Sequence, residues 1–269
     1  MSRKIGILVC SCDKYADVWN PMFEMFFKFW KDCPFNVYLM TNQMKFADDR
    51  VISICTGDDI SWSIGFRKAL ETIKEEKVFI IMEDYILREK VNTEVFYKLY
   101  EYMNREKAVC VRTFPSLYCN EPYYGRFENI KIGRVKKGDP YRISLQAGLW
   151  NREYVMSIID DKDSAWEFEH KGSKRSKSDN DKILCTLDKE NIIFNYYCTG
   201  VIQGYWIQEA VDLCRENNVY VDTKKRKIEP EEVRKKRIRG EKNFVKLKTL
   251  LKKTFIYDLY RYQKFGKRV

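Results

Sequence analysis

The sequence has only one histidine, His170, among its 269 residues, and it lacks the short motifs that identify several large enzyme classes. A single histidine excludes a zinc site built from several histidines and any mechanism that needs two of them. No GxSxG is present, which argues against the serine nucleophile of an α/β-hydrolase. The absence of GxGxxG and GxxxxGKS/T disfavours a dinucleotide-binding Rossmann site and a P-loop.

Long apolar runs are also absent. Val78–Met82 is among the longest, whereas a helix that spans a bilayer needs about 20 apolar residues. The first residues lead into the strand-like run Ile5–Cys10 without the apolar stretch of a signal peptide. The nine cysteines include no CxxC pair, and several lie in apolar runs where cysteine acts as a small hydrophobic residue. We therefore expect a cytoplasmic chain with reduced thiols.

Charge is distributed unevenly along the chain. Residues 224–269 contain 18 Lys and Arg against 5 Asp and Glu, a net charge of +13, whereas the whole chain carries +11, which leaves −2 for residues 1–223. We accordingly expect a catalytic domain over residues 1–223 and a basic extension over residues 224–269.

The extension also has an apolar pattern. From Phe244 to Val269, leucines and aromatic residues recur with helical spacing among lysines, which predicts a basic amphipathic helix on an anionic membrane surface. One alternative is a helix packed against its own domain. A nucleic-acid arm is less in keeping with a sequence that has no nucleic-acid-binding motif.

Strand-like and helix-like segments alternate over the first half of the chain. Apolar runs predict strands at Ile5–Cys10, Val37–Met40, Val51–Cys55, Val78–Met82 and Ala108–Thr113. Amphipathic spacing predicts helices at Asp17–Lys31, Ser63–Glu75 and Thr93–Arg105. This alternation predicts a Rossmann-like α/β fold, in which helices flank a mostly parallel sheet.

The alternation weakens after residue 115. Residues 118–138, rich in tyrosine, glycine and charge, predict an excursion or a small hairpin, and a core-like run follows at Ile143–Trp150. For the remainder we predict a helix at Glu153–Ile159, a polar loop at Ser164–Ser178, a helix at Asp179–Leu187 and a strand at Ile192–Tyr197.

Polar residues follow three of the predicted strands. Ser11 and Asp13 follow the first, Asn42 follows the second, and Glu83 and Asp84 follow the fourth. Because ligands bind at the carboxyl ends of the strands in a parallel sheet, these residues are expected to converge on one crevice.

Two of these loops have side chains suited to a nucleotide. Glu83 and Asp84 offer carboxylates to a Mg²⁺ or Mn²⁺ ion that also binds substrate phosphates and neutralises a departing diphosphate. The alternative is a helix cap or a solvated acidic pair. Ser11, Asp13 and Tyr15 are candidates to contact a base or a ribose, with Asp13 accepting from ribose hydroxyls. Here the alternative is an ordinary turn with a helix cap.

Two glutamates, Glu167 and Glu169, alternate with Trp166 and Phe168. In an extended segment both carboxylates would point one way and both aromatic rings the other. A partly desolvated glutamate has a raised pKa and can remove a proton from an acceptor hydroxyl. The alternative is a charged surface loop held in place by Trp166.

The run Arg142–Trp150 combines an amide side chain with small residues. Ala147 and Gly148 allow a ligand to approach the backbone closely, and Gln146 is a candidate to bind sugar hydroxyls. An ordinary core strand with a glycine bulge explains the same residues.

The segments LVCSCDKYADVW, MEDYIL, SLQAGLW, WEFE and GSKR together resemble bacterial glycosyltransferases of the GT-A class that act in capsule and lipopolysaccharide biosynthesis. The resemblance covers Ile5 to Trp206. In that class a DXD motif after a central strand binds a divalent cation and the nucleotide diphosphate. Glu83-Asp84-Tyr85 takes this place here without matching DXD strictly, which implies that Asp84 is the contact to the metal and the diphosphate. Glu167 or Glu169 would be the base of an inverting reaction.

The resemblance further implies a nucleotide-diphosphate sugar as donor and a saccharide or lipid-linked saccharide as acceptor, at the inner face of the cytoplasmic membrane. Arg142, Lys174 and Arg175 are then candidates to neutralise phosphate charge. Two other functions stay open. A nucleotidyltransferase would be expected to have a glycine-rich, basic loop where this chain has Ser11–Tyr15. A non-catalytic saccharide-binding or scaffold protein would bind neither nucleotide nor metal.

Overall fold

The computed structural model describes residues 4–115, 122–177, 180–188, 191–197, 199–237 and 239. The chain divides into two compact units, Met1–Cys198 and Thr199–Val269, which are described one after the other. The predicted boundary between residues 223 and 224 stays a prediction, because most of the basic extension lies outside the described residues.

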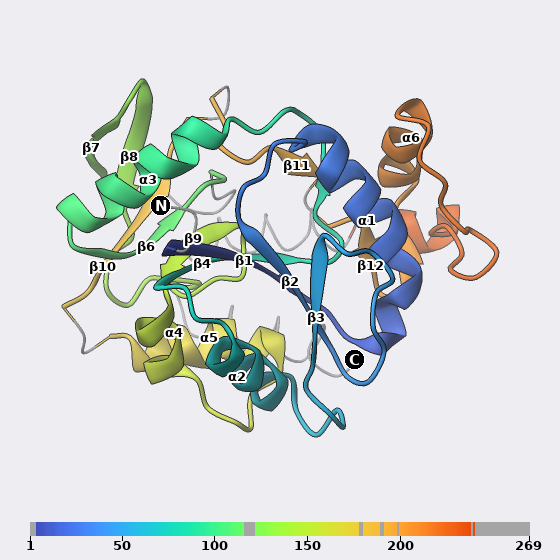
Figure 1. Ribbon diagram of the computed structural model, residues 1–269, viewed down its shortest axis with the longest axis horizontal. Helices are drawn as coiled ribbons and strands as arrows, with labels where there is room; N and C mark the ends of the chain where they lie inside the picture. Colours follow the sequence, from blue (N-terminus) through green and yellow to red (C-terminus); the bar gives the residue numbers. More distant parts are fainter. Residues whose placement is uncertain are drawn as a thin grey trace. The chain divides into compact units, whose positions relative to one another are not determined.

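The first unit is built on one nine-stranded sheet (Figure 1). In their order across the sheet, its strands are β3 (Val51–Cys55), β2 (Asn36–Thr41), β1 (Ile5–Cys10), β4 (Lys77–Met82), β9 (Gly148–Asn151), β6 (Ala108–Arg112), β10 (Lys182–Thr186), β8 (Ile130–Arg134) and β7 (Tyr123–Phe127). Only β9 and β8 run against the direction of the other described strands of this sheet. The prediction of a mostly parallel α/β sheet is therefore confirmed.

The register of the central strands brings their carboxyl ends together. β1 lies between β2 and β4 and is parallel to both. Cys10, the last residue of β1, lies opposite Met82, the last residue of β4. The loops that begin at Ser11 and at Glu83 therefore leave the sheet side by side.

Helices cover both faces of the sheet (Figure 1). The helices α1 (Ala16–Phe29) and α3 (Thr93–Arg105) lie on one face, and α2 (Trp62–Thr72), α4 (Arg152–Ile158) and α5 (Ala165–Arg175) lie on the other. Sequence dictates this placement locally: Phe66, Ala69 and Leu70 give α2 a fully buried stripe, and the Ser61 side chain caps its first turn by accepting from Ile64 N at 3.1 Å.

An aromatic cluster fills the core beneath α1 and α3. Phe96 lies between Trp30 and Phe79, with ring centroids 4.5 and 4.9 Å away, and Phe79 in turn packs against Phe194 at 5.0 Å. Aromatic rings bury large apolar areas, so this cluster anchors both helices to the sheet.

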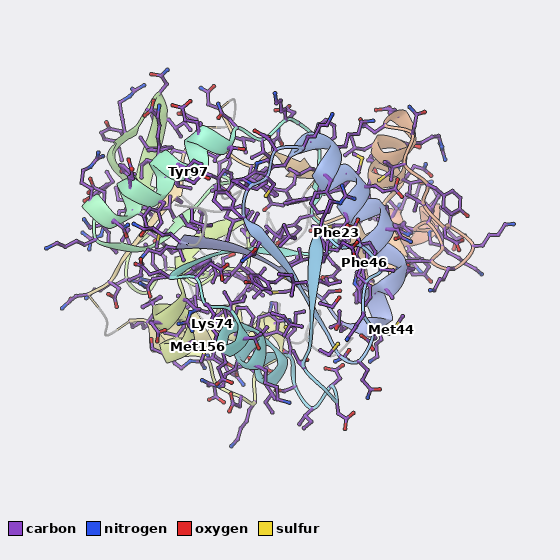
Figure 2. All side chains as sticks on the ribbon, viewed as in Figure 1. Phe23, Met44, Phe46, Lys74, Tyr97 and Met156 are labelled. Atoms are coloured by element: carbon purple, nitrogen blue, oxygen red, sulfur yellow. The ribbon has the colours of Figure 1, made fainter. Side chains whose placement is uncertain are left out.

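The loop that follows β2 is fixed to α1 by ring stacking. Figure 2 labels Phe46, in this loop, and Phe23, in α1, whose rings are stacked with centroids 4.9 Å apart. Phe46 also meets Trp19 edge-on at 6.4 Å. The loop that carries Asn42 therefore has a defined position at the end of the sheet.

Two predicted elements are wrong. The predicted loop Ser164–Ser178 contains the helix α5, which begins with a complete capping box between Ser164 and Glu167. The predicted helix Asp179–Leu187 contains the strand β10 instead. Its residues are buried from Ile183 onward because β10 lies between β6 and β8. A short apolar run does not distinguish a buried strand from a helix.

Other late elements are confirmed in part. β7 and β8 form the hairpin predicted within residues 118–138. In the run Ile143–Trp150, only the end becomes strand β9, and the residues before it are a buried irregular segment. Two short strands pair antiparallel, β5 (Ile86–Leu87) and β11 (Tyr196–Tyr197), the latter within the predicted strand Ile192–Tyr197.

The second unit contains the hairpin β12 (Val201–Ile202) and β13 (Tyr205–Trp206), followed by α6 (Gln208–Glu216). Trp206 is fully buried, and its backbone bonds to Lys227 O and Glu229 N at 2.9 and 2.8 Å. Residues 231–237 are helical. The helix predicted from Phe244 lies outside the described residues. Among the described helices, none is long and apolar enough to cross a bilayer.

Candidate functional site

The loops after β1 and β2 are joined by reciprocal hydrogen bonds. Asp13 N donates to Asn42 Oδ1 at 3.0 Å, and Asn42 N donates to Asp13 Oδ1 at 2.9 Å. Asp13 lies in a 3₁₀ helix, Asp13–Tyr15, whose last residue is half-buried. The structure thus brings together the two strand ends that the sequence places on one edge.

The carboxylate of Asp13 is occupied by the backbone of its neighbour loop. Besides Asn42 N, it accepts from Gln43 N at 3.0 Å and from Met44 N at 3.1 Å. Both oxygens are therefore engaged, and this geometry does not support the predicted contact between Asp13 and a ribose. Ser11 has a similar structural role, because its buried hydroxyl accepts from Trp19 Nε1 at 2.8 Å.

The acidic pair after β4 contains two different environments. Glu83 is buried, at 6% exposure, whereas Asp84 is half-buried. Burial raises the pKa of the Cys10 and Cys12 thiols, and the negative charge of Glu83 raises it further. The charge of Glu83 thus affects the thiols at the end of β1. Asp84 is the more accessible carboxylate of the pair.

Tyr85 directly follows the acidic pair in the sequence, which predicted no role for its side chain. Its hydroxyl donates to Leu145 O at 3.3 Å, and its ring stacks on Tyr196 with centroids 4.3 Å apart. Tyr196 in turn accepts from Ala147 N at 3.3 Å. The only available signal was the position of Tyr85 directly after the acidic pair.

Glu169 reaches the same backbone segment from the other side. Its Oε1 accepts from Leu145 N at 2.7 Å and from Ser144 Oγ at 2.9 Å. The backbone of one residue, Leu145, therefore links the half-buried Glu169 carboxylate to the loop that carries Asp84 and Tyr85.

Glu167 lies in a different environment from Glu169. Two residues along a helix differ by about 200° around its axis, so the predicted alignment of both carboxylates on one side is wrong. Glu167 accepts from Ser164 N at 3.0 Å and pairs with Lys171 at 3.0 Å. The bond from Ser164 N lowers the pKa of Glu167 most, and Lys171 adds to the shift. A raised pKa was expected, and the structure corrects this for Glu167.

The predicted phosphate-binding cations occupy three different environments. Arg142 is 1% exposed and donates to Asp181 O at 2.7 Å. Arg175 pairs with the buried Asp163 at 2.6 Å. Both guanidinium groups thus stabilise the fold here, contrary to the predicted contact with phosphate. Lys174 is exposed on α5.

Gln146 lies between two buried residues of the same segment. Leu145 and Ala147 are 6% and 0% exposed, whereas Gln146 is half-buried. Its side chain is therefore the accessible one of the three, which is compatible with the sugar contact predicted for it.

The residues present fit a metal ion that binds together with substrate. Within the part of the chain that the structure describes, no group of three or more His, Cys, Asp or Glu is arranged to hold a metal. Mg²⁺ and Mn²⁺ are commonly bound by one or two carboxylates, with substrate phosphates and water completing the shell. The single carboxylate of Asp84 is enough for such an ion when a diphosphate supplies further oxygens.

The comparisons with known proteins give distant structural matches. No model of a known protein family matches the sequence. A search of curated proteins finds no relative. The bifunctional IspDF of Campylobacter jejuni is similar with 15% identity and a TM-score of 0.42, over 70% of this chain and 51% of that chain. S. aureus TarS 1–349 in complex with UDP is similar with 12% identity and a TM-score of 0.49, over 81% and 66% of the two chains.

A third similar structure is a UDP-glucose pyrophosphorylase complexed with UDP-glucose, with 8% identity and a TM-score of 0.48, over 81% of this chain and 99% of that chain. This chain spans 51% of the length of IspDF and 60% and 66% of two structures of TarS 1–349, in each case less than two thirds. The neighbours include a glycosyltransferase and nucleotidyltransferases.

The Asp13 carboxylate accepts from three consecutive backbone N–H groups of the loop after β2, those of residues 42–44, and we call this contact the Asp13 clamp. It predicts an effect on the free energy of unfolding. In Asp13→Asn, an amide NH₂ replaces one of the two carboxylate oxygens. It would then face backbone N–H groups, such as those of Gln43 and Met44, that donate to Asp13 Oδ2 in the unchanged protein. Asp13→Asn is expected to lower the free energy of unfolding by about 1–2 kcal/mol, because hydrogen bonds from partly exposed N–H groups to a charged acceptor are lost. Urea unfolding followed by tryptophan fluorescence measures this. Asp59→Asn, at an exposed position of the neighbouring loop, is the control. Equal stability of the two variants would contradict the clamp.

Proposed function

We propose that this chain is a nucleotide-sugar-dependent glycosyltransferase that inverts the configuration of the anomeric carbon. The observation that carries the proposal is that the backbone of one residue, Leu145, bonds to Glu169 through its N–H and to Tyr85, in the loop of Asp84, through its carbonyl. It joins a candidate base to a candidate diphosphate site at the carboxyl end of β4. Transfer from a nucleotide sugar needs both functions within one substrate length of each other.

In the proposed mechanism, Asp84 would hold a divalent cation together with the diphosphate of the donor at the end of β4, because two anions repel each other in direct contact. A divalent cation, when bound with the donor, would neutralise the diphosphate charge. Glu169 takes the proton of the acceptor hydroxyl as its oxygen forms a bond to the anomeric carbon. The bond from that carbon to the diphosphate breaks on the opposite face, and its electron pair leaves with the nucleoside diphosphate.

Glu169 is the better base for physical reasons. The lowered pKa of Glu167 makes it a weak proton acceptor, and its carboxylate completes the capping box of α5. Glu169 has one oxygen held by Ser144 and Leu145, which fixes its orientation beside the candidate substrate site. The half-buried Gln146, which follows Leu145 in the sequence, would bind a hydroxyl of the donor sugar or of the acceptor sugar.

The substrate classes follow from the sequence resemblance. We propose a nucleotide-diphosphate sugar as donor and a saccharide or lipid-linked saccharide of a cell-surface polysaccharide as acceptor. A nucleotidyltransferase is the alternative with the same layout. The loop Ser11–Tyr15 does not favour it, because this loop lacks glycine and its Asp13 is engaged with the backbone.

Two matched substitutions test the base. Glu169→Gln keeps an oxygen that accepts from Ser144 and Leu145 but removes the basic group, and should lower kcat about 10²–10⁴-fold. Glu167→Gln is the control, because glutamine also completes a capping box and kcat should change little. The rate of nucleoside diphosphate release is the measurement, with a donor and acceptor that support turnover of the unchanged protein. Full turnover of Glu169→Gln would remove the base from the mechanism. Release of pyrophosphate instead would indicate a nucleotidyltransferase.

We also propose that the chain acts on the inner face of the cytoplasmic membrane, held there by its basic C-terminal residues. The support comes from the sequence alone, since Phe244–Val269 lies outside the described residues. Lysines near an anionic surface contribute about 1 kcal/mol each, and the leucines and aromatic residues among them suit the interface.

Deletion of Phe244–Val269 should abolish association with vesicles of phosphatidylglycerol and phosphatidylcholine, measured by sedimentation. The full chain should sediment with these vesicles, less so at higher salt because screening weakens the attraction. Vesicles of phosphatidylcholine alone are the control. Unchanged sedimentation after the deletion would rule out the C-terminal residues as the anchor.

A further inference from the structure

The segment Ser144–Ala147 is held by side chains from three elements. Leu145 donates its N–H to Glu169 at 2.7 Å and accepts from the Tyr85 hydroxyl at 3.3 Å. Ala147 O accepts from both Thr113 N and Thr113 Oγ1, at 3.0 and 2.9 Å. The position of the segment Ser144–Ala147 thus depends on the residues that follow β4 and β6 as well as on α5.

The helix that carries Glu169 is packed closely on the same segment. Ser173, one turn after Glu169, accepts from Ile143 N at 2.9 Å. A Cβ added to Gly172 would lie 3.5 Å from Ile143, an ordinary van der Waals distance, so the gap between helix and segment is no wider than one methyl group. With its helix fixed, the orientation of the Glu169 carboxylate depends on the Leu145 N–H and the Ser144 hydroxyl, which both donate to its Oε1.

Tyr85 is mechanically tied to the candidate diphosphate site. Tyr85 N donates to Met82 O at 3.2 Å and Ile86 N donates to Asp84 O at 3.1 Å, so Asp84 and Tyr85 belong to one tight turn. A ligand that draws Asp84 toward it therefore also moves Tyr85. The ring of Tyr85 is stacked on Tyr196, which limits this movement and keeps the hydroxyl directed at Leu145.

We propose that Tyr85 is a positioning residue that links occupancy of the diphosphate site at Asp84 to the orientation of Glu169. The link runs through two hydrogen bonds to the backbone of one residue: from the Tyr85 hydroxyl to Leu145 O, and from Leu145 N to Glu169 Oε1. The proposal rests on the function proposed above. Its consequence is that the base is aligned by the donor, so that an acceptor hydroxyl is deprotonated only when the donor is in place. Bonds of this kind are often long without substrate and shorten in the complex.

The first test observes the link without turnover. In protein labelled with ¹⁵N-leucine, the Leu145 amide signal is identified by its loss in Leu145→Met. Magnesium pyrophosphate serves as the probe of the diphosphate site, and calorimetry measures its binding. The Leu145 signal should shift on addition of the probe in the unchanged protein. In Tyr85→Phe, which keeps the stacked ring, the probe should bind with similar affinity but leave the signal in place.

Tyr97→Phe is the matched control, because Tyr97 is a half-buried tyrosine of α3 whose ring meets Phe35 edge-on at 5.4 Å (Figure 2). It should respond as the unchanged protein does. A Leu145 shift of equal size in Tyr85→Phe, or binding without any Leu145 shift, would overturn the link while leaving the diphosphate site intact. Failure of the probe to bind would instead overturn the placement of the diphosphate and the link with it.

The second test is kinetic. Misplacement of a reacting group by about 1 Å can cost about 10²-fold in rate, so Tyr85→Phe should lower kcat about 10- to 100-fold with an unchanged KM for the donor. Residues that act as a unit are not additive. The double variant Tyr85→Phe/Glu169→Gln should therefore be no slower than Glu169→Gln alone. Multiplying losses, or a loss confined to the KM for the donor, would show that Tyr85 acts independently of Glu169.

Discussion

β1 pairs in parallel with β2 on one side and with β4 on the other, and the candidate site depends on this arrangement. Because Cys10 lies opposite Met82, the chain leaves both strands at the same height. The acidic loop after β4 and the Asp13 loop after β1 then share one edge of the sheet. A shift of one residue in either register would exchange the faces of the strand and separate these loops.

The helix α5 determines which glutamate can act. Its capping box engages Glu167 in the first turn, and the helical period directs Glu169 toward the segment Ser144–Ala147 instead. Two glutamates that are only two positions apart in α5 thus have different roles. Glu167 stabilises the helix start with a pKa below its usual range, and Glu169 is left to bind Ser144 and Leu145.

The sequence predicted the first half of the fold well, for a physical reason. Ile5–Cys10 and Val78–Met82 are continuous apolar runs of strand length, and amphipathic helices with clear spacing separate the strands. The run Lys182–Thr186 was predicted as part of a helix because its length and composition suit either structure, and burial between β6 and β8 decides the matter. The capping box at Ser164 was readable in the sequence and would have identified α5.

The candidate site was harder to predict, because its decisive contacts join distant residues. The bond from Leu145 to Glu169 spans 24 positions, and that from Tyr85 to Leu145 spans 60. Loop convergence followed from topology, so Asp13, Asn42 and Asp84 were placed at the correct edge. Burial of Arg142 and the use of Asp13 as a clamp depend on tertiary packing, which no local pattern encodes.

The proposed function requires the end of β4 to bind a nucleotide diphosphate through Asp84. A thermal-shift panel of nucleoside diphosphates and nucleotide sugars, each with and without Mn²⁺, tests it most directly. A ligand that binds only the folded state stabilises it by about 2.7 kcal/mol at 100 times its Kd. We expect a Mn²⁺-dependent rise in Tm with one nucleoside diphosphate and with the nucleotide sugar that contains it. Asp84→Asn should abolish this rise. No rise with any nucleotide, or the same rise in Asp84→Asn, would contradict it.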